Sequence, residues 1–237
     1  MLLNPYRFAS AGGDPYWSSN VKLLCHLDGT NGQTTTVDSS PGALTLTMSG
    51  TGVKLSTAQA KFGATSFDAS ASASSRKISA PSSADWVFGS GQFTVESFVR
   101  FTASPSGVLN IVSCWWGVGN GQTFLLGHVS GSLAFYYSTD GTNNPNVGAA
   151  WTPTLNQWYH IAADRDASNV LRVYVDGSVH ASATVASTFY ASTGNLEVGA
   201  NNSFSGITGY LDEVRITKGV ARYGGAFTPP SSAFPNF

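Results

Sequence analysis

Carboxylates are the side chains of this sequence best suited to catalysis, and they are sparse. Glycoside cleavage requires two carboxyl groups, about 5 Å apart when one acts as nucleophile. The sequence has only three glutamates, Glu96, Glu197 and Glu213, and none of them has a second carboxylate at the spacing such a pair needs. The nucleophile motif G-x-S-x-G is also absent from the sequence. We therefore predict a protein that is not an enzyme.

Histidine and cysteine could bind zinc, but their spacing does not favour it. A zinc site usually has at least two such ligands at a recognisable spacing. Each histidine stands alone on a predicted strand: His26, His128, His160 and His180. The two cysteines, Cys25 and Cys114, allow at most one disulfide. We interpret them as buried thiols, with a bridge or a reactive thiol as the alternative.

Opposite charges gather in "GYLDEVRITKGVARY" (209–223), although only 11% of the residues are charged. Side chains alternate between the two faces of a strand, so strict alternation places Glu213 with Arg215 and places Asp212 on the other face. A lone charge inside the protein would cost several kcal/mol. We therefore predict that Glu96, on the segment "FTVESFVRF", forms a partly buried structural ion pair with Arg215.

Aromatic side chains give the remaining hint of function, because a flat ring can stack on the apolar face of a sugar. Adjacent residues on a strand point to opposite faces, so one of Tyr136 and Tyr137, and one of Trp115 and Trp116, must point away from the core. We take Trp116 and Tyr137 as candidate ligand or partner contacts. Core packing is the alternative for every such ring. Three further aromatic residues could belong to such a sugar-stacking surface: Trp151, Trp158 and Tyr190.

Strands must position these side chains. Short apolar or alternating runs recur along the chain, each bounded by Gly, Pro, Asn, Asp or Ser. The expected strands are 21–27, 43–48, 76–80, 92–101, 108–115, 123–129, 133–138, 158–165, 170–177, 178–184, 195–200 and 208–217. Asp176-Gly177 suits the type I′ turn of a hairpin, and short helical turns are expected near 82–87 and 218–223. The pattern predicts a single all-β sandwich.

Composition excludes several classes of partner. The net charge is −1 and the sequence contains no cluster of Lys and Arg, so we expect neither nucleic-acid binding nor attraction to an anionic membrane. The first seventeen residues contain one basic residue and no apolar run of seven or more. We therefore expect no signal peptide and no membrane insertion.

Four segments, in order, resemble one known family. "FTVESFVRF", "WYHIAADRD", "LRVYVDGS" and "GYLDEVRITKGVARY" resemble the laminin G-like branch of the concanavalin A-like lectin/glucanase superfamily, and "LLCHLDGTNG" is similar to its opening strand. The resemblance covers about 21–223 and implies a two-sheet antiparallel jelly roll of about a dozen strands. Members that cleave glycans carry Glu-x-Asp-x-x-Glu or a close variant on one strand, which this chain lacks.

The resemblance also implies a calcium ion, because many laminin G-like domains hold one at a loop-rich edge. Pairing 23–28 antiparallel with 209–215 would bring Asp28 close to Asp212, and the loop "DGTNGQTTTVDSS" adds Asp38. Carboxylate and carbonyl oxygens are the ligands that Ca²⁺ prefers. Asp-Gly and Asp-Ser pairs are also ordinary turn formers, and this is the alternative interpretation. No cofactor is expected to be required.

The chain ends suggest where the protein acts. "NPYRFA" and "RITKGVARYGGAFTPPSSAFP" are similar to versions of this domain in tailed-bacteriophage virion proteins. We divide the chain into an N-terminal arm over 1–20, a laminin G-like domain over 21–223 and a Pro/Ser-rich tail over 224–237. The arm contains four aromatic residues, which would need a surface to pack on: Tyr6, Phe8, Tyr16 and Trp17. That surface is either the chain's own sandwich or a neighbouring subunit.

Two functions follow from the sequence. The first is a non-catalytic structural module at the virion surface, a capsid decoration, head-fibre or tail-associated protein. Its arm would contact phage capsid or tail proteins in a homo-oligomer or multicopy assembly, and its sandwich could adhere to host or environmental glycans. The alternative is a stand-alone, calcium-assisted carbohydrate-binding lectin. A glycoside hydrolase is a distant third.

Overall fold

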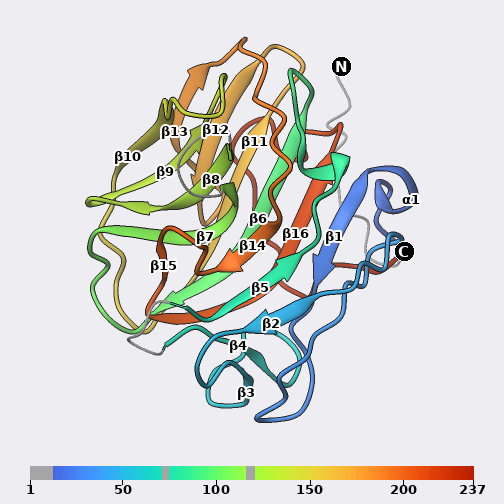
Figure 1. The fold of residues 1–237 in the computed structure, drawn as a ribbon, viewed down its shortest axis with the longest axis vertical. Coiled ribbons are helices and arrows are strands. Elements are labelled where there is room, and N and C mark those ends of the chain that lie inside the picture. Colours follow the sequence, from blue (N-terminus) through green and yellow to red (C-terminus); the bar gives the residue numbers. More distant parts are fainter. Residues whose placement is uncertain (1–12, 71–74, 116–120) are drawn as a thin grey trace.

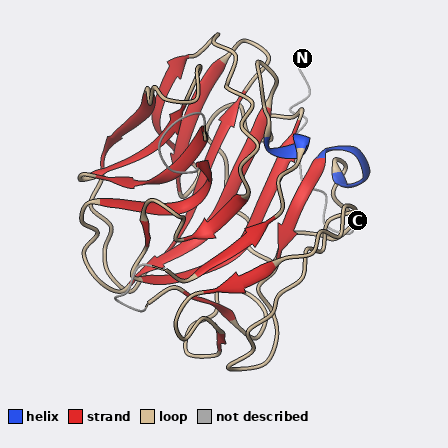
Figure 2. Ribbon diagram, in the orientation of Figure 1, coloured by secondary structure: helices blue, strands red, loops and turns tan. Residues whose placement is uncertain are grey.

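A computed structural model describes residues 13–70, 75–115 and 121–237, and it shows a sandwich of two β-sheets (Figures 1 and 2). Neighbouring strands pair antiparallel, except for the two-residue strand β15, which pairs parallel with β7. The prediction of an all-β sandwich is therefore confirmed. Among the described residues, no helix is long and apolar enough to cross a membrane.

We call the two layers sheet A and sheet B. Sheet A has the order β13 (Ser178–Thr184), β12 (Val170–Val175), β11 (Trp158–Arg165), β6 (Phe93–Phe101), β16 (Gly209–Lys218), β4 (Ser66–Asp68) and β3 (Leu55–Ser56), and β1 (Val21–Cys25) also pairs with β16. Sheet B has the order β10 (Asn146–Ala150), β9 (Ser132–Tyr137), β8 (Gln122–Val129), β7 (Val108–Trp115), β14 (Leu196–Gly199), β5 (Lys77–Ala80) and β2 (Thr47–Ser49), and β15 (Ser205–Gly206) also pairs with β7.

The core lies between the sheets because the strands alternate as expected. On β6, Val95 and Val99 point into the core together with the rings of Phe93 and Phe101. The Phe93 ring stacks on Phe88 with centroids 4.3 Å apart. Aromatic pairs of this kind add about 0.5–1.5 kcal/mol beyond the burial of their area. The inner face of β6 therefore holds the centre of the sandwich.

Local structure follows the turn chemistry in most places. Asp176 and Gly177 have φ angles of 47° and 76°, as the predicted type I′ turn between β12 and β13 requires. A 3₁₀ helix, η1, spans Ala84–Trp86 within the first expected helical turn. Residues 218–223 form no helix, contrary to expectation, whereas the helix α1 (Trp17–Asn20) was not expected.

A β-bulge in β16 overturns the predicted alternation of its charges. Glu213 has a φ of 51°, and two residues, Glu213 and Val214, stand between Asp212, which pairs with Phe98, and Arg215, which pairs with Glu96. One extra residue shifts the alternation by one. Val214 therefore points into the core. Asp212 and Arg215 share the outer face instead of lying on opposite faces.

The segment that begins at Asp14 and the C-terminal segment both pack on the outer face of sheet A. The backbone N–H of Asp14 donates to the carbonyl of Phe237, so these two segments also meet. Phe234 is buried against Leu24 and Phe98. The ring of Phe227 stacks on Tyr223 with centroids 3.5 Å apart. Among the described residues, the segments on either side of 20/21 and of 223/224 are therefore in contact.

Candidate functional site

The outer face of sheet A is built mainly by β6, β11 and β16, which lie side by side (Figure 1). On β6 the outward side chains are Thr94, Glu96, Phe98 and Arg100. The first three are buried under the chain ends and the loop at Phe62, whereas Arg100 is only half-buried. The face is thus divided into a covered part and an open part.

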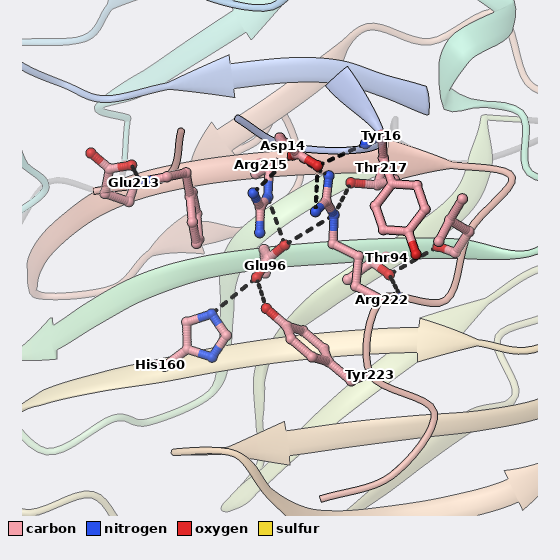
Figure 3. A network of polar contacts seen from close by, with 12 residues as sticks. Asp14, Tyr16, Thr94, Glu96, His160, Glu213, Arg215, Thr217, Arg222 and Tyr223 are labelled. Atoms are coloured by element: carbon pink, nitrogen blue, oxygen red, sulfur yellow. Dashed lines mark hydrogen bonds and ion pairs between the residues drawn. The ribbon is translucent and has the colours of Figure 1, made fainter. Parts of the chain in front are cut away.

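The covered part holds a network of polar side chains (Figure 3). The carboxylate of Glu96 accepts a hydrogen bond from Nε of Arg215 at 2.9 Å, and the two residues are cross-strand partners. It also contacts Nε2 of His160 at 3.1 Å and accepts from the hydroxyl of Tyr223. The structure therefore confirms the predicted Glu96–Arg215 ion pair.

A second carboxylate, Asp14, completes the network. Its Oδ2 lies 2.6 Å from Nη2 of Arg222 and 3.2 Å from Nη1 of Arg215. The Arg222 guanidinium also donates to Thr217 and lies over the ring of Tyr16. Two guanidinium groups therefore balance two carboxylates, Asp14 and Glu96, in a site closed to solvent.

This network stabilises the fold and does not act on a ligand. Burial opposes ionisation of Glu96, but the charge of Arg215 and the hydrogen bond from His160 hold the pKa of Glu96 well below its ordinary value. Glu96, His160 and Arg215 are all buried, so no substrate reaches them. Removing one member of such a buried, charge-balanced cluster is expected to destabilise the fold.

The open part of the face is half-buried and places an arginine between two aromatic residues, of which Trp158 also packs against the cluster of Val21, Leu24, Phe98 and Phe234. Trp158 of β11 stands directly opposite Arg100 of β6, which stands opposite Tyr210 of β16. Directly opposed side chains have Cβ atoms about 5 Å apart, and all three residues are half-buried. We call Trp158, Arg100 and Tyr210 the aromatic–arginine row.

A loop extends this surface along the same face. Lys61 and Phe62 are half-buried, and their backbone N–H groups donate to the carboxylate of Asp212, which pairs with Phe98. The ring of Phe62 meets Phe98 edge-on with centroids 5.2 Å apart. The Lys61 ammonium lies 5.2 Å from the centroid of Phe98 and 5.3 Å from that of Phe62. Phe98 lies two residues from Arg100, roughly 7 Å along the strand.

The residues predicted as ligand or partner contacts lie in different places in the structure. Tyr6, Phe8 and Trp116 lie outside the described residues. Tyr137 packs on the core, with its ring stacked on Phe189 at 4.8 Å. Tyr16 lies under Arg222, and Trp17 packs against the cluster of Val21, Leu24, Phe98 and Phe234. The part of the arm from Asp14 onward therefore packs on its own sandwich, the first of the two surfaces considered for it.

The three carboxylates considered for calcium do not fit a calcium site. Asp28 accepts the backbone N–H groups of Ala64 and Thr65, and Asp212 accepts those at positions 61 and 62. Asp38 accepts N–H groups from three other residues: Leu24, Ser40 and Leu44. Across 13–70, 75–115 and 121–237 no group of three or more His, Cys, Asp or Glu side chains could hold a metal ion. These carboxylates anchor loops.

The cysteines agree with the interpretation as buried thiols. Cys25 and Cys114 are free and buried. Burial raises the pKa of both thiols, and Asp38 and Glu213 raise that of Cys25 further. A thiol whose pKa is raised is a poor nucleophile. Neither cysteine therefore belongs to a reactive site.

The sequence pattern contained part of this site. Trp158 was among the candidate platform rings, and the alternation of β6 places Arg100 outward, as the structure shows. Tyr210, Lys61 and Phe62 were missed. The signal for Tyr210 is its register with Arg100, which depends on the pairing of segments 110 residues apart in sequence. Nothing in the local pattern identifies Lys61 and Phe62.

Comparisons with solved structures show the same fold in proteins of low sequence identity. Similar structures include the binding domain of Paraclostridial Mosquitocidal Protein 1 (TM-score 0.62, 13% identity, 87% of this chain and 51% of that chain). They also include the botulinum neurotoxin serotype G binding domain (0.65, 16%, 86% and 49%). A third is the botulinum neurotoxin serotype D ligand binding domain in complex with N-acetylneuraminic acid (0.63, 13%, 85% and 48%). This chain thus spans about half the length of these chains.

Comparison with curated proteins gives no match. Among protein families, the model of the concanavalin A-like lectin/glucanases superfamily matches residues 71–221. The match includes β6, β7, β8, β11 and β16, which form the centre of the sandwich. The resemblance found in the sequence is thereby confirmed at the level of the family. The chain belongs to the concanavalin A-like lectin/glucanases superfamily.

Proposed function

We propose that this protein is a non-catalytic carbohydrate-binding module and that the aromatic–arginine row is its binding platform. The observation that carries the proposal is the cross-strand placement of Arg100 between Trp158 and Tyr210 on a half-buried surface. Flat rings offer an apolar surface to the C–H face of a sugar, and the arginine offers several hydrogen-bond donors to its oxygens. Membership of a superfamily that includes lectins adds support.

The similar solved structures are consistent with a binding role. Two are described as binding domains and a third as a ligand binding domain in complex with N-acetylneuraminic acid. Those descriptions concern longer chains of 13–16% identity. A fold supports many functions, so the proposal rests on the residues of this chain.

Trp158→Ala is expected to weaken retention on immobilised glycans by about tenfold or more, because loss of a stacked ring removes about 1.4 kcal/mol or more of binding free energy. Affinity chromatography or calorimetry on the glycan that the unmodified protein retains best measures the effect. Tyr190→Ala is the matched control, because Tyr190 is another half-buried ring outside the aromatic–arginine row. Loss of retention in Tyr190→Ala with none in Trp158→Ala would place the platform elsewhere.

No hydrolysis of β-glucans, galactans or other polysaccharides is expected. Glu96 is sealed in the covered network, Glu197 pairs with Lys77 at 2.6 Å, and Glu213 contacts His26 at 2.9 Å. A glycosidase needs an acid and a nucleophile that face the same glycosidic bond. Each of these three glutamates instead contacts a basic side chain of its own. A reducing-end assay tests this. Release of reducing ends that disappears in Glu197→Gln or Glu213→Gln would contradict it.

We further propose that the module is displayed on a bacteriophage virion. The support is the similarity of the two chain ends to tailed-phage virion proteins. Tyr16 and Trp17 no longer support it, since both pack within the described part of the chain. Mass measurement of assembled particles tests the proposal. Stoichiometric presence would support it, and absence from purified virions would refute it.

A further inference from the structure

We infer that the saccharide bound by the aromatic–arginine row carries a carboxylate, and that Arg100 is the residue that selects it. This inference rests on the proposed function, because it names the class of sugar taken by the same site. The Nε of Arg100 is buried and has no hydrogen-bond partner among the described residues.

An unpaired buried donor is unusual. Leaving such a group without a partner costs about 1–3 kcal/mol, and more when the group is charged. The other arginines on this face are paired: Arg215 and Arg222 both contact Asp14. In the described part of the chain, Arg100 makes no ion pair, although it is half-buried. Because Arg100 as a whole is only half-buried, it is a charge without a counter-ion on a partly open surface.

The nearest acidic side chains do not compete for Arg100. Asp68 is next in the row beyond Tyr210, but its carboxylate lies 3.0 Å from Nη1 of Arg76 and 3.7 Å from Nζ of Lys54. Asp212 pairs with Phe98, two residues before Arg100 on β6, and it accepts the backbone N–H groups of Lys61 and Phe62. Burial raises the pKa of Asp212 to about 8, against the opposing effect of the hydrogen bonds from positions 61 and 62.

Lys61 adds a second positive charge to the same surface. Its ammonium lies over the rings of Phe62 and Phe98, and it makes no ion pair with any described residue. In a protein of net charge −1, two cations without acidic partners stand beside half-buried rings. A local excess of positive charge attracts anionic ligands and repels cationic ones.

The geometry favours a carboxylate on a sugar ring. The guanidinium fork matches a planar carboxylate through two parallel hydrogen bonds. A pyranose that lays its C–H face on Trp158 or Tyr210 brings a carboxylate on its edge to Arg100, which stands between them. A uronic acid or a sialic acid has this combination. A neutral hexose would leave the charge of Arg100 without its counterpart.

The experiment compares acidic saccharides with matched neutral ones. Titration calorimetry is run with 3′-sialyllactose against lactose, and with an oligogalacturonide against its methyl ester. We expect at least one acidic member to bind tenfold or more tightly than its neutral partner, and raised salt to reduce that difference. In Arg100→Gln the preference should fall to within threefold, because the acidic saccharide loses more affinity than its neutral partner.

Arg172→Gln serves as the control, because Arg172 is another half-buried arginine of sheet A, paired with Asp166 at 2.7 Å. It should keep the acidic preference. Equal binding of acidic and neutral saccharides by the unmodified protein would overturn this inference and leave the proposed function standing. An acidic preference that survives in Arg100→Gln would also overturn it. If no saccharide in a broad glycan array binds, the proposed carbohydrate-binding function itself is contradicted.

Discussion

Asp14→Ala is expected to lower the free energy of unfolding by about 3–5 kcal/mol, because removing one partner of a buried ion pair leaves uncompensated charge. Asp14 neutralises Arg222 and contacts Arg215, and both guanidinium groups are buried. Without Asp14 the network has two positive charges and one negative charge. Urea-induced unfolding at pH 7, followed by tryptophan fluorescence, measures the loss.

The control for Asp14 is Asp85→Ala. Asp85 pairs with Lys22 at 3.8 Å, and both side chains are partly exposed. An exposed pair contributes about 0–1 kcal/mol. If Asp14→Ala were no more destabilising than Asp85→Ala, the segment 14–17 would be separable from the sandwich. That result would favour the other alternative, an arm that packs on a neighbouring subunit.

Glu96→Gln and Arg215→Met should each destabilise the fold by a few kcal/mol, because either change unbalances the buried network. The first leaves an excess positive charge and the second an excess negative charge. The double variant leaves Arg222 with Asp14, so the charges balance again. It should therefore recover part of the loss. Single variants that are neutral in urea would show that the pair is solvated.

The same pair predicts a pH dependence. The folded-state pKa of Glu96 is held below its ordinary value of 4.5 by Arg215 and His160, despite the opposing effect of burial. A carboxyl whose pKa is lower in the folded state stabilises the protein above the unfolded pKa. This contribution begins to fall as pH drops below about 4.5 and is fully lost only below the folded-state pKa. The difference in unfolding free energy between the wild type and Glu96→Gln should therefore become smaller between pH 7 and pH 3.

Much of the fold could be predicted from the sequence because its signals are local. The expected strands at 108–115, 158–165 and 178–184 have the same first and last residues as β7, β11 and β13. Alternating apolar residues determine both the strand and its buried face. The strands that were missed are short or rich in small residues, so no apolar pattern indicates them: β3, β4, β10 and β15.

The rest depends on contacts between distant segments. The bulge at Glu213 requires a positive φ in a residue that is not glycine, and no local pattern indicates it. Its effect is to move Arg215 onto the face of Asp212. The docking of Asp14 and Phe234 on sheet A likewise joins segments about two hundred residues apart. These contacts decide which part of the face stays open.

The candidate site likewise has features that the local sequence predicts and features that depend on contacts between distant segments. Trp158 and the outward direction of Arg100 follow from strand alternation. That Arg100 is open while Glu96 is sealed follows only from where the chain ends lie. The sequence therefore predicts the side chains on a face, and tertiary packing decides which of them a ligand can reach.

The most direct test of the binding platform is an NMR titration that follows the indole N–H signals of the six tryptophans. The titrant is the saccharide retained best on a glycan array, and each signal is assigned by a Trp→Phe variant. The signal of Trp158 should shift progressively with ligand, while those of buried Trp86 and core-packed Trp151 stay in place. A saturable shift of Trp115 or Trp116 with an unchanged Trp158 would contradict the assignment of the aromatic–arginine row as the carbohydrate-binding site.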